Sequence, residues 1–476
     1  MSWQTIVKEN RLEVSVIGLK QLFIDNPNLR IDSDYFRNDY LNDNSRIQTK
    51  RWSYLGDISK SVINFGAYSL TNFIEFLDEG VPFLNVGDIK ENNIEVENAK
   101  RIDEKLSVEV LKKSLVLEGQ VLLTIAGTIG NAAVAYGLPK NTNSNQAIAN
   151  ITLKDEVSPF FLSTFLNSKY GKSQTGRLTI SSVQPNLLLT QVKLVKVPIP
   201  SDELQKTIEK SYKDFQQLLR KSAEAYKEAE QLLLKEINLT DYKPSNKNTS
   251  VRSLTKCLAD DRFDAEYWQI DFDTIQDTIK KHKDGFDTLD KLFEIADKKS
   301  RIDPQKEYLY AELADVNSAM GTIDNLTALQ GKELPSRGRM ALKKNDIIVS
   351  SVEGSLEKIA LVLSEEKNII GSTGFFVLRQ KAYEPEVALI LLKSKPIQRL
   401  LKRQAQGTIL TAIPKTSLPR VLLPKLNPSV QKQVKERVAQ SHKERQEAKD
   451  LLEKAKRAVE IFIEQDEKQA LAYLNK

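Results

Sequence analysis

The sequence contains the same unusual seven-residue pattern twice, near its start and near its midpoint. Residues 30–36 read RIDSDYF and residues 262–268 read RFDAEYW, with Arg, a hydrophobic residue, Asp, a small residue, an acid, Tyr and an aromatic residue in order. The chain has 476 residues, so the 232 positions between the copies are close to half its length. Solenoid repeats have periods of about 20–50 residues, so a period this long indicates a duplicated domain.

Further matches follow at a nearly constant spacing. Asp88 in NVGDI corresponds to Asp315 in ELADV, 227 positions later. LNSK at 166–169 corresponds to LKSK at 392–395, and Gln205 to Gln431, each 226 positions later. Every match is weak alone, because these residue types are common. Their shared spacing along each half is difficult to produce by chance, and it predicts two copies of one fold.

Each half has the same internal order of elements. Short apolar runs come first, such as VLLTIAG and AIANITL in the first half and DIIVSSV and TGFFVLR in the second. Gly, Pro and Asn separate these runs, as expected for strands and turns of an α+β domain. Each half then ends in a long helical stretch that begins just after a Pro-rich boundary, PIPSDELQ or LPKLNPSVQ, with Ser201 or Ser429 as N-cap.

Both helical stretches have buried-type residues at alternating spacings of three and four, the heptad pattern of helices that wind on one another. The positions are Ile208, Tyr212, Phe215, Leu219, Ser222, Tyr226, Ala229 and Leu233, and then Val434, Val438, Ser441, Arg445, Ala448, Leu452, Ala455, Val459 and Phe462. The alternative is an amphipathic helix that lies on a globular core. A helix of about 37 residues is roughly 55 Å long, which favours pairing of the two helices. We expect the polar Ser441 and Arg445 to set the register.

Composition excludes several classes of protein. The hydrophobic fraction is 40% without a run long enough to span a membrane, and a single Cys excludes an internal disulfide. The N-terminus lacks the pattern of a secretory signal, so we expect a cytoplasmic, soluble protein. The formal net charge of +6 permits a polyanion as partner but does not select one.

The common catalytic and cofactor motifs do not occur in the sequence. Two His and one Cys are too few for a zinc site built from those residues, and GKS at 171–173 lacks the first Gly of a phosphate loop. GTIG at 127–130 fits either a tight turn or a phosphate-binding loop. We expect Asp32 and Asp34, like Asp264 and Glu266, to bond local backbone donors or the flanking arginines. A chain of this kind is predicted to recognise or assemble partners.

The duplicated pattern resembles the specificity subunit of type I restriction–modification enzymes over nearly the whole chain. The resemblance lies in RIDSDYF and RFDAEYW, in LEGQVLLTIAGTIG and LKKNDIIVSSVEGS, and in the two long helices with their Pro-rich starts and Gln-Lys pairs. None of these is a catalytic motif, so the specificity of the match lies in their order and duplication. The family commonly has Glu-Gln at each helix start, where this chain has Leu204-Gln205 and Val430-Gln431.

The resemblance implies an α+β fold with two duplicated target recognition domains, separated by two long helices that form an antiparallel coiled coil with pseudo-two-fold symmetry. It implies that each domain reads one half of a bipartite site in double-stranded DNA, and that the helices set the spacer and dock two methylation subunits, with restriction subunits as further partners. S-adenosylmethionine, ATP and Mg would belong to those partners, and this chain would be non-catalytic with no cofactor, metal site or membrane contact.

The predicted organisation has six parts. They are an N-terminal segment 1–29, a first target recognition domain 30–200, a central helix 201–239, a linker 240–261, a second target recognition domain 262–427 and a C-terminal helix 428–476.

Loops rich in small polar, amide and basic side chains are the candidates for DNA contacts, because such groups match phosphates and base edges. In the first half they are Gly127, Thr128, Asn131, Asn143, Asn145, Gln146, Ser181, Ser182 and Gln184. In the second half they are Ser350, Ser351, Ser355, Lys358, Ser372, Thr373, Thr408, Thr411 and Lys415. For each loop a solvated turn is the alternative.

Two other functions remain open from the sequence. One is a coiled-coil scaffold protein whose globular domains bind protein or RNA partners. The other is a nuclease or methyltransferase with an unfamiliar site. Sequence preference on duplex DNA would distinguish the first of these from a specificity subunit, and S-adenosylmethionine binding by the isolated chain would support the second.

Overall fold

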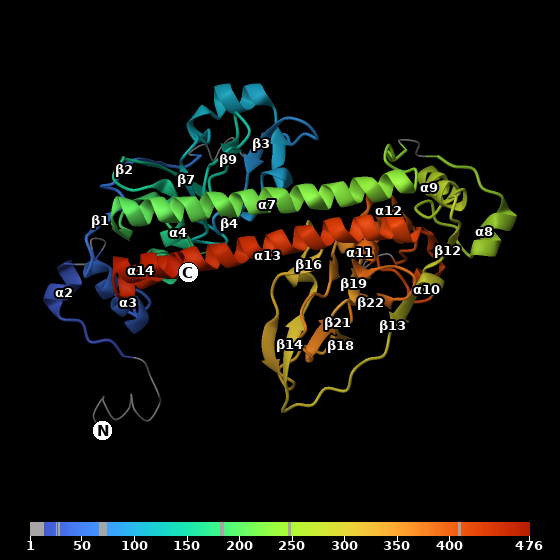
Figure 1. The fold of residues 1–476 in the computed structure, drawn as a ribbon. Helices are drawn as coiled ribbons and strands as arrows, with labels where there is room; N and C mark the ends of the chain where they lie inside the picture. The colour runs from blue at the N-terminus through green and yellow to red at the C-terminus, as the bar shows by residue number, and fades with distance from the viewer. Residues whose placement is uncertain are drawn as a thin grey trace. The chain divides into compact units, whose positions relative to one another are not determined.

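The two halves of the chain each contain a four-stranded central sheet with the same strand order. Each half also contributes one of the two long helices, α7 (Asp202–Glu236) and α13 (Pro428–Glu464) (Figure 1). In a computed structural model, residues 14–24, 26, 29–65, 74–180, 185–245, 249–407 and 411–476 are described. The chain divides into unit 1, which comprises Met1–Leu219 and Gln446–Lys476, and unit 2, which comprises Arg220–Arg445. The two long helices therefore each contribute a segment to both units.

The central sheet of each unit is antiparallel and is built on a short, fully buried apolar strand. In unit 1 its order is β2 (Ser59–Ile63), β10 (Ile148–Leu153), β7 (Val121–Thr124) and β8 (Ala132–Val134). In unit 2 it is β13 (Phe293–Ala296), β22 (Phe375–Gln380), β19 (Ile347–Ser350) and β20 (Ile359–Leu361). Strands β7 and β19, VLLT and IIVS, are buried at every position, because side chains pack on both faces.

A second sheet in each unit combines antiparallel and parallel pairs. In unit 1 the order is β6 (Lys100–Ile102), β3 (Val81–Leu84) and β9 (Asn143–Ser144). In unit 2 it is β17 (Thr327–Gln330), β14 (Glu307–Ala311), β21 (Ile369–Ser372) and β18 (Gly338–Leu342). The pairs β3·β9 and β14·β21 are both parallel. The same uncommon pairing in both units confirms the predicted duplicated α+β fold.

Smaller elements complete each unit. Strand β1 (Trp52–Tyr54) pairs with β11 (Lys196–Pro198), and β12 (Phe286–Thr288) pairs with β23 (Leu422–Pro424). Hairpins β4 (Ile89–Lys90) with β5 (Asn93–Ile94) and β15 (Val316–Asn317) with β16 (Thr322–Ile323) correspond. Helices α3 (Asn38–Gln48), α4 (Pro159–Asn167) and α5 (Lys169–Leu178) correspond to α9 (Ile270–Lys280), α11 (Pro385–Lys393) and α12 (Lys395–Arg403). The short helices are α2 (Leu19–Ile24), α6 (Leu189–Val192), α8 (Leu254–Asp260) and α10 (Leu289–Leu292).

The long helices are α7 (Asp202–Glu236) and α13 (Pro428–Glu464), of 35 and 37 residues. Every predicted heptad position is buried or half-buried. In unit 2 the buried hydroxyls of Ser222 and Ser441 lie 3.1 Å apart, and each donates to the backbone carbonyl of the other residue. Glu228 pairs with Arg437 at 3.2 Å, so these segments run antiparallel. The structure therefore has a polar contact at Ser441, and a one-position slip would bury unpaired hydroxyls. That Ser441 and Arg445 set the register stays a prediction.

One glutamine attaches the start of each long helix to its unit. The amide oxygen of Gln205 accepts from the Ser158 backbone N–H at 2.7 Å, and its nitrogen donates to the carbonyls of Glu156 and Pro200. Gln431 accepts from the Glu384 backbone N–H at 3.1 Å and donates to the carbonyls of Ala382 and Leu426. The repeated glutamine noted in the sequence is therefore the attachment point of the helix.

The repeated seven-residue pattern, at 30–36 and 262–268, forms the same set of contacts in both units, which we call the clamp. Arg30 pairs with Asp32 at 2.7 Å, and Asp32 also accepts the Tyr35 backbone N–H. Arg30 lies over one side of the Tyr35 ring, 4.9 Å from its centroid, while Arg177 of α5 lies 4.2 Å from it. The hydrogen bond from Arg30 lowers the pKa of Asp32. The clamp holds the start of the domain to the end of α5.

In unit 2 the corresponding residues repeat each contact. Arg262 pairs with Asp264 at 2.6 Å, which lowers the pKa of Asp264. Arg262 and Arg403 lie 4.4 Å and 4.2 Å from the centroid of the Tyr267 ring. This arrangement confirms the structural role predicted for Asp32 and Asp264.

Two predicted segments differ in detail. The C-terminal helix is not continuous, because α13 ends at Glu464 and a separate helix, α14 (Glu467–Leu474), follows. Asp466 is the N-cap of α14, and its side chain accepts the Gln469 backbone N–H. The predicted linker contains α8, whose N-cap is Ser253. The six domain boundaries themselves stay a prediction. Within the described ranges, no helix has an apolar stretch long enough to cross a membrane.

The corresponding helices α4 and α11 end in different residues. In unit 1 the last residue is Asn167, whose oxygen accepts the Ala132 backbone N–H at 3.0 Å and whose nitrogen donates to Ala132, Asn92 and Ser163 oxygens at 2.7–2.9 Å. In unit 2 it is Lys393, whose ammonium donates to the Ser318 carbonyl. Both side chains fix a neighbouring hairpin turn to the helix, with different chemistry.

Lys393→Met is expected to change how the stability of unit 2 depends on pH. Burial lowers the pKa of Lys393 to about 8, against the opposing effect of Glu230 and Glu357. The unfolded chain holds this proton up to the ordinary pKa of 10.5. Between these values the unfolded state binds more protons, so the free energy of unfolding rises with pH. Below pH 8 Lys393 is charged in the folded protein, so burial of that charge lowers the free energy of unfolding by its full amount.

The Met variant lacks that cost, so at pH 7 we expect it to be more stable by about 1–2 kcal/mol and to lose this advantage by pH 9.5. Urea unfolding of the full chain at both pH values measures the difference. Lys395→Met, an exposed change two residues away, serves as control and should show no pH-dependent difference. Parallel pH profiles for Lys393→Met and wild type would contradict the assignment.

Candidate nucleic-acid interface

Three segments, two of which carry predicted DNA-contacting residues, converge at one end of the central sheet in unit 1. They are residues 125–131 after β7, residues 144–147 after β9, and residues 185–187. The Ile125 backbone N–H donates to the Ala147 carbonyl at 2.8 Å, and the Leu187 N–H donates to the Ile125 carbonyl at 2.9 Å. Ala126 and Asn186 form a β-bridge. We call these segments the loop set of unit 1.

Unit 2 reproduces the same backbone hydrogen bonds. The Ser351 N–H donates to the Gly374 carbonyl at 2.9 Å, and the Ile413 N–H donates to the Ser351 carbonyl at 2.7 Å. Val352 and Ala412 form the matching bridge. The loop set of unit 2 therefore comprises residues 350–355, 372–374 and 411–413. The structure brings together loops that lie far apart in the sequence, and it does so in the same way twice.

The turn GTIG in the loop set of unit 1 depends on glycine for its backbone conformation. Gly127 has φ of +71° and Gly130 has φ of +87°, which L residues rarely adopt. A Cβ on Gly130 would lie 2.9 Å from the Thr175 hydroxyl. Gly127 and Thr128 are exposed at the tip of this turn. The geometry is that of a tight turn that presents backbone groups to solvent.

Of the other residues predicted in unit 1, Asn131 and Asn145 are half-buried and hydrogen bonded within the protein. Asn131 donates to the Ile89 carbonyl at 3.2 Å and accepts from the Lys172 ammonium at 2.8 Å. Asn145 donates to the Asn85 side chain at 3.1 Å. Gln146 is half-buried in the same loop. Ser181, Ser182 and Gln184 lie outside the described residues.

In unit 2, Lys415 is exposed, while Thr373 and Thr411 are half-buried in the loop set or beside it. Ser351 donates to the Gly374 carbonyl at 2.9 Å. The Ser355 hydroxyl lies 2.9 Å from that of Ser350. Thr408 lies outside the described residues.

Four predicted contact residues have internal roles in this structure. Asn143 is 0% exposed and its amide donates to Ser107 and Leu111. Ser350 and Ser372 are buried, and their hydroxyls accept the backbone N–H groups of residues 352 and 374. The Lys358 ammonium donates to the Val316 carbonyl at 2.7 Å. These side chains hydrogen bond within their own fold, and their contact with DNA stays a prediction.

Basic residues outside the predicted set lie beside the loop set of unit 2. The Ser300 N–H donates to the Arg339 carbonyl at 2.7 Å, and the Thr373 N–H donates to the Arg337 carbonyl at 2.8 Å. The segment around Ser300 therefore lies next to β18, which lies next to Ser372 and Thr373. We call Lys298, Lys299, Arg301, Arg337 and Arg339 the basic edge; all but Arg339 are exposed. The runs KKSR at 298–301 and SRGR at 336–339 are the sequence features that could have indicated this basic edge.

In unit 1, exposed lysines occupy the corresponding place. Lys112 and Lys113 precede Leu115, which forms a β-bridge with Asn143 of β9. By contrast, Lys172 behind the turn is engaged internally, because it contacts Asn131 and lies 3.4 Å from Glu91. Burial lowers the pKa of Lys172, while Glu91 opposes that shift. Lys172 supports the turn, and the exposed lysines carry the free positive charge.

Comparisons with known proteins give matches for this chain. Residues 50–231 match the model of the type I restriction modification DNA specificity domain. A crystal structure of the type I restriction–modification system S subunit from M. genitalium matches with a TM-score of 0.39 and 14% identity, over 90% of this chain and 96% of that one. The HsdS subunit from Thermoanaerobacter tengcongensis matches with a TM-score of 0.27 and 15% identity, over 90% and 95%.

Proposed function

We infer that the chain belongs to the type I restriction modification DNA specificity family, whose model matches residues 50–231, and we propose that it is the specificity subunit of such a system. The observation that carries this proposal is the repetition of the loop set. Two units present the same three loops in the same hydrogen-bonded arrangement, with different side chains on them. Two equivalent surfaces of different chemistry suit two half-sites of different sequence.

The chemistry of each surface suits duplex DNA. Exposed Lys and Arg contact phosphates and fix the orientation of a protein on the helix, while polar loop side chains read base edges. The basic edge supplies the first kind of group in unit 2, and Lys112 and Lys113 supply it in unit 1. Thr128 and Lys415 are exposed candidates for the second kind.

The long helices complete the proposal. We propose that α7 and α13 fix the distance between the two half-sites and dock two methylation subunits, so that transfer of the methyl group takes place on those partners. This chain then acts as a non-catalytic component, and S-adenosylmethionine, ATP and Mg belong to the assembled complex. The complex would act in the cytoplasm, where the DNA lies.

A mobility-shift experiment with the chain in complex with its methylation subunits tests the proposal. The complex is expected to select a bipartite sequence from a pool of random duplexes, and adenine methylation mapped in the host genome should report the same sequence. Binding to duplex DNA without any sequence preference would contradict a specificity function. Preferential binding to RNA or to a peptide would support the scaffold alternative instead.

Arg301→Ala with Arg337→Ala is expected to weaken DNA binding of the complex by about tenfold, because two phosphate contacts are lost. Phosphate contacts carry no sequence information, so the loss should be similar for all sites, and the dependence of log K on log salt should become shallower by about two. Lys280→Ala on α9, an exposed change in the same unit, is the control. An unchanged salt dependence in the double variant would exclude the basic edge from the interface.

A further inference from the structure

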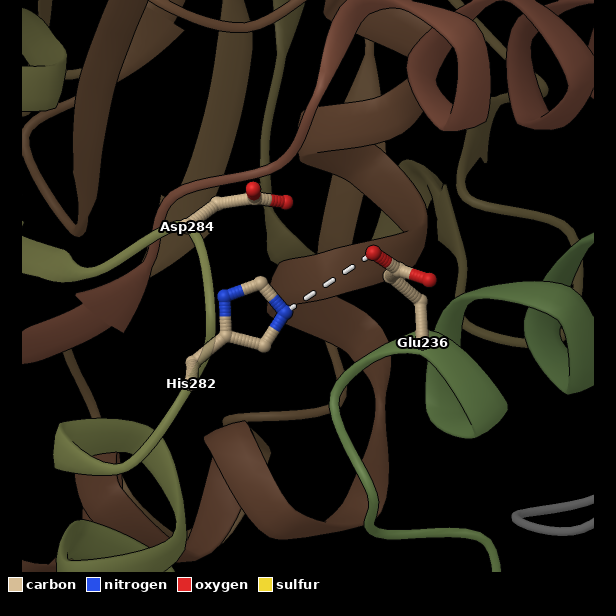
Figure 2. Close-up of side chains that lie close together, drawn as sticks. All are labelled: Glu236, His282 and Asp284. Atoms are coloured by element: carbon tan, nitrogen blue, oxygen red, sulfur yellow. Dashed lines mark ion pairs between the residues drawn. The ribbon is translucent and has the colours of Figure 1, made fainter.

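Three side chains of unit 2 converge at the end of the long helix α7. They are Glu236, His282 and Asp284, and one potential ligand atom from each lies within 4.8 Å of the others. Figure 2 shows the imidazole beside the two carboxylates, with its Nε2 facing Glu236. The Nε2–Oε1 distance is 3.9 Å. The cluster lies outside the loop set and has no part in the proposed reading of DNA.

Local structure brings the three residues together. Glu236 is the last residue of α7, and Asn238 just beyond it has φ of +55°, which ends the helix. His282 follows α9, and its carbonyl accepts the Gly285 backbone N–H at 2.9 Å, closing a tight turn. Ile237 and Ile279 pack in one buried cluster beside them. The turn and the helix end are therefore both fixed to the core.

His282 is the unusual member of this cluster. Its side chain is only 1% exposed, yet neither ring nitrogen has a hydrogen-bond partner among the described residues. A buried polar atom normally has a partner, because burial without one costs free energy. Its Nε2 faces the Glu236 carboxylate, so this nitrogen is available to a ligand held among the three side chains.

The corresponding position in unit 1 suggests the kind of ligand. There α13 ends beside the turn that follows α3, and the Lys50 ammonium donates to the Gln465 carbonyl at 2.7 Å. Lys50 and His282 stand at matching positions, two residues beyond α3 and α9. In unit 1 the Lys50 ammonium, a positive charge of the protein itself, thus joins the helix end to the turn. In unit 2 the corresponding helix end and turn carry an imidazole and two carboxylates instead.

We propose that Glu236, His282 and Asp284 bind one Zn²⁺ ion, which joins the end of α7 to the turn before β12. Imidazole nitrogen and carboxylate oxygen are both zinc ligands, and three protein ligands leave a fourth position for water. With bonds of about 2.1 Å, tetrahedral ligand atoms lie about 3.4 Å apart. The Glu236–His282 pair needs to close only slightly, and the exposed Asp284 is free to complete the set.

Lys283 is the competitor for this site. Its ammonium lies 2.9 Å from the Glu236 carboxylate, and its side chain is 63% exposed. Zinc binding requires this exposed ammonium to turn away into solvent, which a long surface side chain does readily. Lys283 leaves the buried imidazole unsatisfied, since neither nitrogen of the His282 ring has a hydrogen-bond partner among the described residues.

Competition titration of the metal-stripped full chain against a chromophoric chelator tests the proposal. Wild type is expected to bind one Zn²⁺ per chain, and to bind Mg²⁺ much more weakly because imidazole favours zinc. His282→Gln and Asp284→Asn should each weaken Zn²⁺ binding by about tenfold or more, since even changes next to a ligand cost that much. Asp277→Asn, an exposed change at the end of the same helix α9, is the matched control and should bind as wild type does.

Co²⁺ gives a second readout, because the visible absorption of bound Co²⁺ depends on its ligands and is stronger at low coordination number. Since Asp284 is exposed, Asp284→Asn is expected to keep the circular dichroism of wild type while losing that absorption. Failure of wild type to bind one equivalent of Zn²⁺ would overturn the proposal. So would binding that Asp284→Asn and His282→Gln leave unchanged, which would mean adventitious binding elsewhere. Either failure leaves the DNA proposal unaffected, because selection of a bipartite site is measured separately.

Discussion

Lengthening both long helices by seven residues is expected to abolish methylation at the native site and to redirect it to the same half-sequences about three base pairs further apart. Seven helical residues add about 10.5 Å, and B-DNA rises about 3.4 Å per base pair. A full heptad preserves the face on which the helices pair. Duplication of residues 223–229 in α7 and 434–440 in α13 places the insertions opposite each other, beside the Ser222–Ser441 pair.

Methylation mapping in cells that carry the lengthened chain measures the new spacing directly. Duplication of residues 223–229 alone is the control, and it should give no methylation at either spacing, because one lengthened helix moves Ser222 out of register with Ser441. A lengthened chain that methylates new half-sequences at the old spacing would show that the helices do not determine the distance between half-sites.

The duplicated fold was predictable because its evidence lies along the chain. RIDSDYF and RFDAEYW repeat at a spacing of 232 positions, and Gln205 and Gln431, like the heptad positions, repeat at 226. In the structure the first repeat forms an Arg–Asp–Tyr clamp and the second attaches a long helix to its unit. The third is the buried face of each long helix, which packs on the domain cores and, at Ser222 and Ser441, on the other helix. Residues that stabilise the fold recur because both units have the same fold and need the same contacts.

The interface was less predictable because its residues share no local signal. Polar residues in loops are used both to face solvent and to satisfy backbone groups, and sequence alone does not separate Thr128, which is exposed, from Asn143, which is fully buried. The basic edge forms only when β18 pairs beside β21. Glu236 and His282 are 46 positions apart in the sequence. Two of the three proposed ligands are carboxylates, which are too common in the sequence to mark a site.

Asn167→Leu is expected to destabilise unit 1 by about 3 kcal/mol or more. Asn167 is 4% exposed and makes four hydrogen bonds, two of them to the backbone of Ala132 in β8. Leu has the same number of side-chain heavy atoms and the same branching, but its bulkier methyl groups form no hydrogen bonds, so the Ala132 N–H and carbonyl are left with fewer partners. The Asn92 side chain, which also receives a bond from Ser163, loses its donor from Asn167.

Hydrogen exchange of the full chain measures where this stability is lost, and the duplication supplies an internal control. Peptides that cover β7 and β8 of unit 1 should exchange faster in Asn167→Leu, while those that cover β19 and β20 of unit 2 should keep wild-type protection. Asn98→Leu, an exposed change in the same unit, should alter the free energy of unfolding by no more than about 0.5 kcal/mol. Equal loss of protection in both units would mean that Asn167 does not act through β8, because unit 2 has Lys393 at this position and lacks the amide network.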